Sequence, residues 1–263
     1  MPAGPLLELV DVTKRFGRIT VAEDLSLVVR EGDAIGVVGP NGAGKSSLFA
    51  VISGDLAADH GEVLLEGRPV TRLDAATRCR LGIGRTYQIP RPFEGMTVFE
   101  NVLVAAQQGS GARRQAAYDL AAGVLDETGL RRQANEPAGR LGLLQRKRLE
   151  LARALATRPR LLLLDEVAGG LTVPEVAALV EIVQAARGRG VAVVWIEHVL
   201  RALVGTVERL ICLAGGRLIG DGTPEEVLAM PSVKEVFLGT GAPAGRPAPV
   251  VARAGLAATR PRP

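Results

Sequence analysis

The sequence predicts an α/β fold: a parallel sheet that carries an antiparallel β subdomain and has an α-helical subdomain inserted into it. Three observations predict this fold. The buried strand expected over 33–38 leads through a glycine-rich turn into a helix. The run 161–164 is four leucines, which need burial on both faces, as in the strands of a parallel sheet. Between these two strands, residues 91–158 are mostly helical by their apolar period.

The beginning of the chain predicts the antiparallel strands. Apolar residues alternate with polar ones over 6–13 and 21–30, and Gly17 lies between the two segments. Towards the other end, Thr223 opens a Thr-Pro-Glu-Glu pattern that is typical of a helix start. The other expected elements are strands over 61–65, 83–86 and 191–196, a hairpin over 209–213 and 217–219, and helices over 46–52, 73–81, 98–107, 113–128, 145–157 and 174–187.

The chain divides into a body and a basic tail. We expect residues 1–240 to form one domain, with the helical subdomain of about 91–158 inserted, and residues 241–263 to be disordered. The segment 239–263 contains four arginines and no acidic residue. Without these four the body has 28 basic and 28 acidic residues, so its net charge does not indicate nucleic-acid binding.

Composition argues against several other classes of protein. The two cysteines, Cys79 and Cys212, have neither metal-site nor disulfide spacing. The longest apolar runs are strand-length, far short of the about 20 residues of a membrane span, and the first residues lack signal-peptide features. We therefore expect a cytosolic protein that reaches a membrane only through a partner. With 3% aromatic residues, a stacking surface for single-stranded nucleic acid is not expected.

The glycine-rich turn is the most informative motif. Residues 39–46 fit G-x-x-x-x-G-K-[ST], the phosphate-binding P-loop, in which backbone N–H groups and a helix N-terminus face a phosphate. Lys45 is then expected to reach the β- and γ-phosphates and Ser46 to ligate Mg²⁺. The alternative, an ordinary turn before a helix, is disfavoured by the strand before it and the helix after it. The expected phosphate-binding residues are Gly39, Pro40, Asn41, Gly42, Ala43, Gly44, Lys45, Ser46 and Ser47.

Two acidic residues follow the leucine run. Asp165 and Glu166 come at the carboxyl end of that strand, which is the edge where ligands bind in parallel sheets. Asp165 suits a Mg²⁺-holding role, and Glu166 suits a base that polarises or positions the attacking water. The alternative is a solvated acidic turn, which the P-loop earlier in the chain disfavours.

Three further residues have a structural interpretation beside a functional one. Phe16, in the connection between the first two strands, is either a small core contact or a ring that stacks on adenine. Gln88 directly follows the strand over 83–86 and, taken alone, is an ordinary polar loop residue. His198 follows the strand over 191–196 and either caps a helix, lies in the core, or contacts the γ-phosphate.

The order of these motifs resembles the ATP-binding subunits of ABC transporters over about 6–238, all of the chain except the tail. The P-loop, 161–166 and 196–198 carry this resemblance most strongly. The stretch 85–98, Arg-Thr-Tyr-Gln-Ile-Pro-Arg-Pro-Phe-Glu-Gly-Met-Thr-Val, is similar to the ATPases of branched-chain amino acid importers, and to the larger of their two ATP-binding subunits. The ending over 222–239 is also similar to theirs.

The resemblance implies a function. Two such subunits sandwich two ATP molecules head to tail, each between one subunit's P-loop and the other's signature sequence. ATP hydrolysis with Mg²⁺ then drives two membrane permease subunits, which an external substrate-binding protein serves. The protein is expected to be cytoplasmic, peripheral on the inner face of the membrane through the permeases, and without a nucleic-acid partner. The resemblance also implies a role for each site residue. Phe16 would stack on adenine, residues 39–47 would hold the phosphates, and His198 would steady the γ-phosphate. Asp165 would hold Mg²⁺ through water, Glu166 would be the catalytic base, and Gln88 would touch Mg²⁺ or the attacking water and sense the permease.

The signature sequence departs from the family pattern. Where the family usually has Leu-Ser-Gly-Gly-Gln, this chain has Leu141, Gly142, Leu143, Leu144 and Gln145. Gly142 lacks the serine hydroxyl that would donate to the γ-phosphate. Leu144 replaces a glycine where backbone must approach phosphate closely, whereas Leu143 is a milder change because similar ATPases often carry an aromatic residue there.

Two smaller departures follow the acidic pair. Val167 stands where the family has proline, and Thr172 stands where many relatives have Asp or Asn, which puts communication between the two ATP sites in question.

We therefore expect the ATPase subunit of an importer for branched-chain amino acids or related amides, in a homodimer or heterodimer with unequal ATP sites. One alternative is a regulatory subunit that binds ATP and scarcely hydrolyses it, which Leu144 favours and the intact Lys45, Glu166 and His198 oppose. The other is a soluble ABC ATPase that acts outside transport. That alternative would call for a tandem second cassette, a long coiled-coil insert or a zinc cluster, and the sequence has none.

Overall fold

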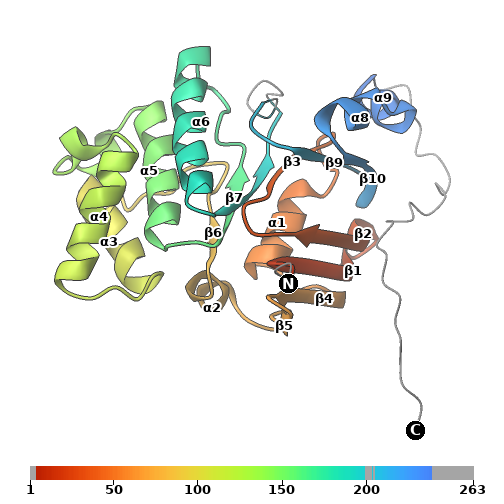
Figure 1. Ribbon diagram of the computed structural model, residues 1–263, viewed down its shortest axis with the longest axis horizontal. Coiled ribbons are helices and arrows are strands. Elements are labelled where there is room, and N and C mark those ends of the chain that lie inside the picture. The colour runs from red at the N-terminus through yellow and green to blue at the C-terminus, as the bar shows by residue number, and fades with distance from the viewer. Residues whose placement is uncertain (1–3, 199–202, 204, 239–263) are drawn as a thin grey trace, which may run out of the picture.

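The computed structural model describes residues 4–198, 203 and 205–238, which form both strands and helices (Figure 1). The strands are β1 (Leu7–Phe16), β2 (Ile19–Val29), β3 (Ala34–Val38), β4 (His60–Leu65), β5 (Arg68–Pro69), β6 (Ile83–Arg85), β7 (Leu161–Asp165), β8 (Ala192–Ile196), β9 (Arg209–Ala214) and β10 (Arg217–Gly222). The helices are α1 (Lys45–Ser53), α2 (Ala75–Arg80), α3 (Val98–Gln108), α4 (Gln115–Glu127), α5 (Leu143–Ala156), α6 (Val173–Gly188), α8 (Pro224–Ala229) and α9 (Pro231–Leu238), with the 3₁₀ helices η1 (Arg131–Gln133) and η2 (Ala138–Arg140).

Six of the described strands form the larger sheet, in the order β10-β9-β3-β8-β7-β6. All of its pairings are parallel except that of β10 with β9. The leucine run lies in β7, between β8 and β6. Leu161 and Leu163 belong to one buried core, and Leu162 and Leu164 belong to the core on the other side. The predicted burial of this strand on both faces is therefore confirmed.

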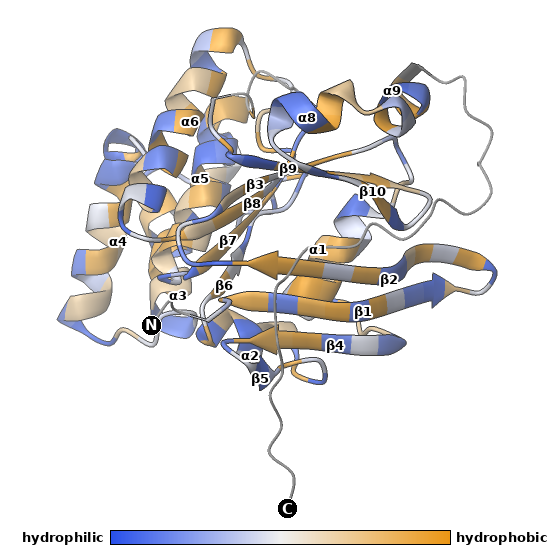
Figure 2. Cartoon of the chain, turned by 45° about the vertical axis from the view of Figure 1, so that its right-hand side comes forward, coloured by the Kyte–Doolittle hydropathy of each residue, from blue (hydrophilic) through white to orange (hydrophobic). Residues whose placement is uncertain are grey.

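The smaller sheet is antiparallel, with the order β2-β1-β4-β5. The helix that follows the glycine-rich turn, α1, joins the two sheets. Its Phe49 belongs to the same buried core as Leu9 of β1 and Val37 of β3. Figure 2 shows that apolar residues dominate the strands of the larger sheet and form stripes on the surrounding helices. The α/β fold with an antiparallel subdomain is therefore as predicted.

Helices α3, α4 and α5 pack together on the side of the larger sheet away from the antiparallel strands (Figure 1). The chain enters them through a segment held by Asn101. This fully buried side chain accepts a hydrogen bond from the N–H of Phe93 and donates to the carbonyls of Phe93 and Thr97. Thr97 caps α3 together with Glu100. The segment between β6 and α3 is thereby tied to the helical part.

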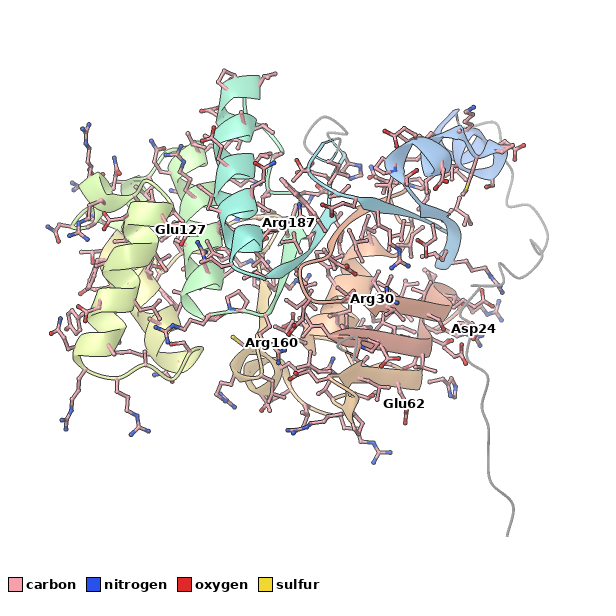
Figure 3. The ribbon with its side chains drawn as sticks, in the orientation of Figure 1. Asp24, Arg30, Glu62, Glu127, Arg160 and Arg187 are labelled. Carbon is pink, nitrogen blue, oxygen red and sulfur yellow. The ribbon has the colours of Figure 1, made fainter. Side chains whose placement is uncertain are left out.

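One arginine links the segment just before β7 to the antiparallel part of the molecule. Arg160, labelled in Figure 3, forms ion pairs with Glu31 and with Glu66, the latter at 2.5 Å. Glu31 lies between β2 and β3, and Glu66 follows β4. The pairs therefore link three segments that are far apart in the sequence.

The structure differs from the predicted elements in several places. Strand β5 was not predicted, and β1 extends to Phe16, which was expected in the connection after that strand. Helix α5 begins at Leu143 rather than at 145, with Gly142 as its N-cap. Helix α9 was not predicted, because its proline start lies directly after α8. The expected disorder of 241–263 and the expected boundary at 240 lie outside the described residues and remain predictions. Among the described helices, none is long and apolar enough to cross a membrane.

Candidate nucleotide site

The P-loop turns sharply between β3 and α1, and two glycines make the turn possible. Gly39 has φ 148° and Gly44 has φ 99°. A Cβ atom on Gly39 would lie 2.1 Å from the carbonyl oxygen of Leu213, and one on Gly44 would lie 2.0 Å from that of Val21. Backbone of β9 and of β2 thus presses on the loop from two directions, so these positions accept only glycine.

Lys45 opens α1 and turns its ammonium group back into the loop. Its side chain is nearly buried, and Nζ donates to the carbonyls of Gly39 and Pro40 at 2.8 and 2.9 Å. Burial lowers the pKa of Lys45, and the nearby carboxylates of Glu166 and Asp165 act in the opposite direction. The positive charge therefore lies within the curl of the loop, where a phosphate group would be bound.

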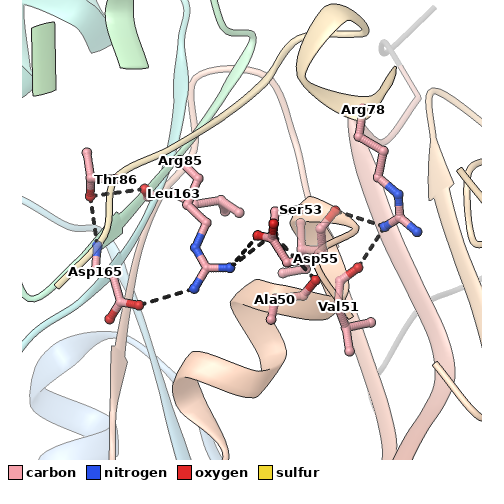
Figure 4. Close-up of polar contacts among 10 residues, drawn as sticks. Ala50, Val51, Ser53, Asp55, Arg78, Arg85, Thr86, Leu163 and Asp165 are labelled. Carbon is pink, nitrogen blue, oxygen red and sulfur yellow. Dashed lines mark hydrogen bonds and ion pairs between the residues drawn. The ribbon is translucent and has the colours of Figure 1, made fainter. Parts of the chain in front are cut away.

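Asp165 ends β7 with its carboxylate buried. Its backbone N–H donates to the hydroxyl of Thr86, and Oδ2 lies 3.4 Å from Arg85 (Figure 4). Burial raises the pKa of this carboxyl group, and Arg85 opposes the rise. Among the described residues, Oδ1 is buried and has no hydrogen-bond partner. A buried carboxylate oxygen without a donor fits a cation or a cation-bound water, so the residues present fit Mg²⁺.

Arg85 also reaches the end of the P-loop helix. One of its guanidinium nitrogens donates to Ser53 at 3.0 Å and to Asp55 at 2.9 Å, while another faces Asp165 (Figure 4). The guanidinium lies 5.0 Å from the ring of Tyr87. Arg85 was not predicted as a site residue. The available signal was a charged residue in a short strand that is otherwise buried.

Two other predicted site residues, Gln88 and His198, contact the carboxylate of Glu166. The side-chain amide of Gln88 donates to Oε2 of Glu166 at 2.5 Å, and Nε2 of His198 lies 2.7 Å from Oε1. Gln88 follows β6, Glu166 follows β7 and His198 follows β8, so all three come from carboxyl ends of neighbouring parallel strands. Gln88 and His198 are exposed, and the Glu166 side chain is 18% exposed. The carboxylate is therefore accessible to water and held on both oxygens.

The carboxylate of Glu166 and the P-loop lie at the same edge of the larger sheet, because each follows the carboxyl end of a parallel strand. Such an edge combines a phosphate cradle with a lysine charge and a carboxylate that can accept a proton from water. Ser46 is exposed at the start of α1, and Ser47 is half-buried. This arrangement suits the transfer of a terminal phosphoryl group of a nucleotide to water.

Phe16 lies apart from this cluster, at the end of β1. Its ring is 51% exposed and has Lys14 Nζ 5.4 Å from its centroid, so it is not the small core contact considered above. The hairpin that carries Phe16 lies against the P-loop through Val21, whose carbonyl faces Gly44. The ring is therefore free to stack on a planar group.

The signature residues lie at the start of α5, in the helical part of the chain. Gly142 has extended backbone angles and makes no side-chain cap, whereas Leu141 is buried. Leu143 is 49% exposed, and Leu144 packs in part against the core. No hydrogen bond joins Leu141, Gly142, Leu143, Leu144 or Gln145 to the P-loop within the part of the chain that the structure describes.

The two smaller departures have simple structural explanations. Val167 is buried, with 1% of its surface exposed, so it contributes to the core after the acidic pair. Thr172 precedes α6 and donates its backbone N–H and its hydroxyl to Glu175, both at 2.8 Å. Thr172 thus serves the start of α6 within its own chain.

Known proteins resemble this chain in sequence over most of its length. The family model described as ABC transporter matches residues 22–169. The high-affinity branched-chain amino acid transport ATP-binding protein LivG of Salmonella typhimurium (strain LT2) is 34% identical over 250 residues, which cover 89% of this chain and 98% of LivG. The lipopolysaccharide export system ATP-binding protein LptB of Acidithiobacillus ferridurans is 33% identical over 236 residues, which cover 89% of this chain and 97% of LptB.

A solved structure extends the agreement to the fold. The crystal structure of an ATP-binding cassette of an ABC transporter, in its ADP conformation, matches with a TM-score of 0.81 and 29% identity. The match covers 90% of this chain and 99% of that chain. With a family match over more than half of its length, a nucleotide-binding neighbour and the P-loop geometry above, this chain belongs to the ABC transporter family, as an ATP-binding subunit with ATPase activity.

Proposed function

We propose that this chain powers the import of branched-chain amino acids or related amides, as one of two ATPase subunits with unequal ATP sites. One observation carries the proposal: Gln88, Glu166 and His198 meet at one sheet edge, while the signature departs from its usual form. The identity to a branched-chain amino acid transport ATPase over nearly its whole length supports the substrate class.

In this proposal the residues of one sheet edge share the work of hydrolysis. Lys45 draws charge from the terminal phosphates, and Glu166 accepts the proton of the attacking water. Gln88 and His198 hold the two oxygens of the Glu166 carboxylate and so orient it. His198 would in addition steady the γ-phosphate, and Gln88 would touch Mg²⁺ or the attacking water. Ser46, Gln88 and, through water, Asp165 would hold Mg²⁺, which supplies charge neutralisation at the phosphate oxygens.

The unequal sites follow from the signature. In a head-to-tail dimer, the site built on this chain's P-loop receives the partner's signature, and the partner's P-loop receives Gly142, Leu143 and Leu144. Gly142 provides no hydroxyl donor to phosphate. Leu143, half exposed at the N-terminus of α5, presents an apolar side chain where a donor-lined surface is needed. Leu144, which packs partly inward, contributes less to this obstruction than its position in the sequence indicates.

A permease contact fits the segment after β6. Tyr87, Ile89 and Phe93 are 41%, 69% and 46% exposed, so three large apolar side chains lie on the surface around Gln88. Such a surface is typical of a protein contact. We propose that two membrane permease subunits bind here, which would place the chain on the inner face of the membrane and bring Gln88 under their influence. An external binding protein would then act through the permeases.

The test is purification of the tagged chain with the permeases and second ATPase expressed alongside it, followed by reconstitution into lipid vesicles. The proposal expects ATP-driven uptake of labelled leucine or a related amide when the binding protein is present. An export cargo would contradict it, and LptB makes this a real alternative because its identity is similar. Rapid ATP hydrolysis coupled to uptake would also rule out a regulatory subunit that binds ATP and scarcely hydrolyses it. If no membrane partner copurifies, a soluble ABC ATPase that acts outside transport would be favoured.

A further inference from the structure

A buried lysine joins the two sides of the catalytic edge. Lys147 lies in α5, near its start, and is 5% exposed. Its Nζ donates to the backbone carbonyl of Gln88 at 3.1 Å and to that of Glu166 at 2.9 Å. These are the two residues whose side chains meet at 2.5 Å. The ammonium group of Lys147 therefore binds the backbones of Gln88 and Glu166, the two residues whose side chains are bonded to each other.

Burying this charge requires compensation. Burial lowers the pKa of Lys147, and the carboxylates of Glu197, Glu166 and Asp165 act against that change. A buried ammonium is unfavourable unless polar groups replace its water, and here two carbonyl oxygens do so. An apolar residue would fill this position in the helix at less cost, so the lysine has a task that packing alone does not explain.

The backbone of Glu166 has a conformation that needs support from its neighbours. Its φ is 48°, in the left-handed region that residues with a Cβ rarely occupy. The backbone N–H of Glu166 donates to the carbonyl of Ile196 at 2.9 Å, and its own carbonyl accepts from Lys147. The two bonds fix the peptide groups on both sides of the Cα atom. Left-handed residues persist at active sites when their surroundings hold them in this way.

The same face of α5 also holds the segment that carries Gln88. Glu150, three residues after Lys147, is buried; burial raises the pKa of its carboxyl group, and Arg153 and the backbone N–H groups of Arg91 and Tyr87 act against that rise. Arg153, three residues further, donates to the carbonyl of Arg91 at 2.8 Å. Residues three apart lie side by side on a helix, so these charged side chains form one row. The row connects the signature helix to the backbone around Gln88.

We propose that Lys147 is a positioning residue for ATP hydrolysis. By binding the carbonyls of Gln88 and Glu166, it fixes the amide and the carboxylate relative to each other, and it ties both to the helix that begins at the signature. Among the described residues, no hydrogen bond joins Lys147 to the phosphate-binding loop. The inference rests on the proposed role of Glu166 as base, and the experiment below separates the two.

The experiment measures ATP hydrolysis by the complex of this chain with its partner ATPase and permeases. Lys147→Met removes the ammonium and keeps an unbranched side chain that is one atom shorter, and Lys147→Arg restores a donor. Arg187→Met is the matched control. Arg187 of α6, labelled in Figure 3, also donates to a backbone carbonyl, that of Thr206 at 3.0 Å, and among the described residues no hydrogen bond joins it to Gln88, Glu166 or His198. Glu166→Gln is measured in parallel.

The expected result is a fall of about 10²-fold in kcat for Lys147→Met with little change in KM for ATP, because small displacements of catalytic groups have effects of this size. Lys147→Arg should recover most of the loss, and Arg187→Met should lower the melting temperature without changing kcat. Wild-type kcat in Lys147→Met, beside a loss in Glu166→Gln, would overturn the inference alone. Full activity of Glu166→Gln would overturn the proposed base instead.

Amide hydrogen exchange provides a readout that does not depend on turnover. In the isolated subunit, Lys147→Met should speed exchange in 87–91 and 166–170, and Arg187→Met should not. Unchanged exchange in both segments would contradict the inference. If Lys147→Met does not assemble, Lys147→Gln replaces it. Its shorter side chain can donate to at most one of the two carbonyls, so the pair is no longer bridged and kcat should still fall; an unaltered kcat in that variant would count equally against the proposal.

Discussion

The side chains of Gln88 and Glu166 meet at 2.5 Å although 78 positions separate them in the sequence. They meet because β6 and β7 are neighbouring parallel strands, whose carboxyl ends lie at one edge of the sheet. His198 contacts the other oxygen of the same carboxylate from the end of β8. The strand order alone therefore assembles the groups around the carboxylate.

Removal of the P-loop lysine should weaken nucleotide binding. Lys45→Ala removes a charge-assisted contact to phosphate, which is expected to reduce the free energy of MgATP binding by about 1.5–3 kcal/mol. Titration calorimetry of the isolated subunit measures this change. Lys234→Ala, at an exposed position of α9, is the control and should bind as the wild type does. Equal affinities of Lys45→Ala and wild type would contradict the assignment of Lys45.

Loss of the buried arginine beneath the P-loop helix should destabilise the fold. Arg78 is 1% exposed and donates to the carbonyls of Val51 and Ile52 at the end of α1, at 2.7 and 2.9 Å (Figure 4). Arg78→Met leaves these buried carbonyls without a donor, and the free energy of unfolding should fall by about 3 kcal/mol. Urea denaturation of the wild type and the variant measures this difference in the free energy of unfolding.

The control for that variant lies two residues away on the same helix. Arg80 is exposed and bonds only to Thr77, at 3.2 Å, among the described side chains. Arg80→Met should change the free energy of unfolding by less than about 0.5 kcal/mol. Similar losses in both variants would mean that the buried contacts of Arg78 are not what stabilises this region.

Cys212 should be inert in the native protein. The thiol is fully buried in β9, and burial raises its pKa to about 11. A raised pKa keeps the thiol protonated at pH 8, so almost no thiolate is present to react. Iodoacetamide at this pH should label the half-buried Cys79 faster than Cys212, and both should react in denaturant. Rapid native labelling of Cys212, read by mass spectrometry, would show that the strand next to the P-loop opens.

Restoration of the signature should raise the activity of the isolated subunit. Gly142 has φ −70° and ψ 173°, which suit a serine N-cap, and only the flexible end of Gln145 lies near the new Cβ, at 3.0 Å. One added donor to phosphate is worth about 10²–10³ in rate, so Gly142→Ser with Leu143→Gly and Leu144→Gly should hydrolyse ATP faster. The glycines reduce helix stability by up to about 1 kcal/mol each.

This loss of stability makes the result easy to interpret. A lower melting temperature together with a higher rate is expected from a restored site, and a general improvement of folding cannot produce that combination. The single variant Gly142→Ser is the control for the hydroxyl alone. An unchanged rate in the triple variant would show that the native signature is not what limits hydrolysis by the isolated subunit.

Local patterns explain how much of the site could be predicted. The P-loop and the pair Asp165 and Glu166 are contiguous in the sequence, so a motif and a leucine run were sufficient to find them. The start of α5 was misplaced because Gly142 gives no side-chain capping signal. The fold class followed from the same runs, since a strand that is apolar on both faces belongs in a parallel sheet.

Residues that act on the backbone were missed. Lys147 donates to backbone carbonyls. Arg85, which was missed as well, donates instead to side chains of α1, of the segment after it and of β7. Every residue has a carbonyl, so a side chain that binds one leaves no partner pattern in the sequence. Arg78 was missed for the same reason. Only the packing of α5 against the strand ends, and of α2 against α1, identifies these contacts.

The most direct test of the unequal-site account is ATP hydrolysis by the assembled complex carrying one Glu→Gln change at a time. Glu166→Gln disables the site that borrows the partner's signature, and the account predicts that it removes most of the turnover. The corresponding change in the partner ATPase disables the site that faces Gly142, Leu143 and Leu144, and most turnover should remain. The account is contradicted if the partner's change is the more damaging one, or if both reduce turnover equally.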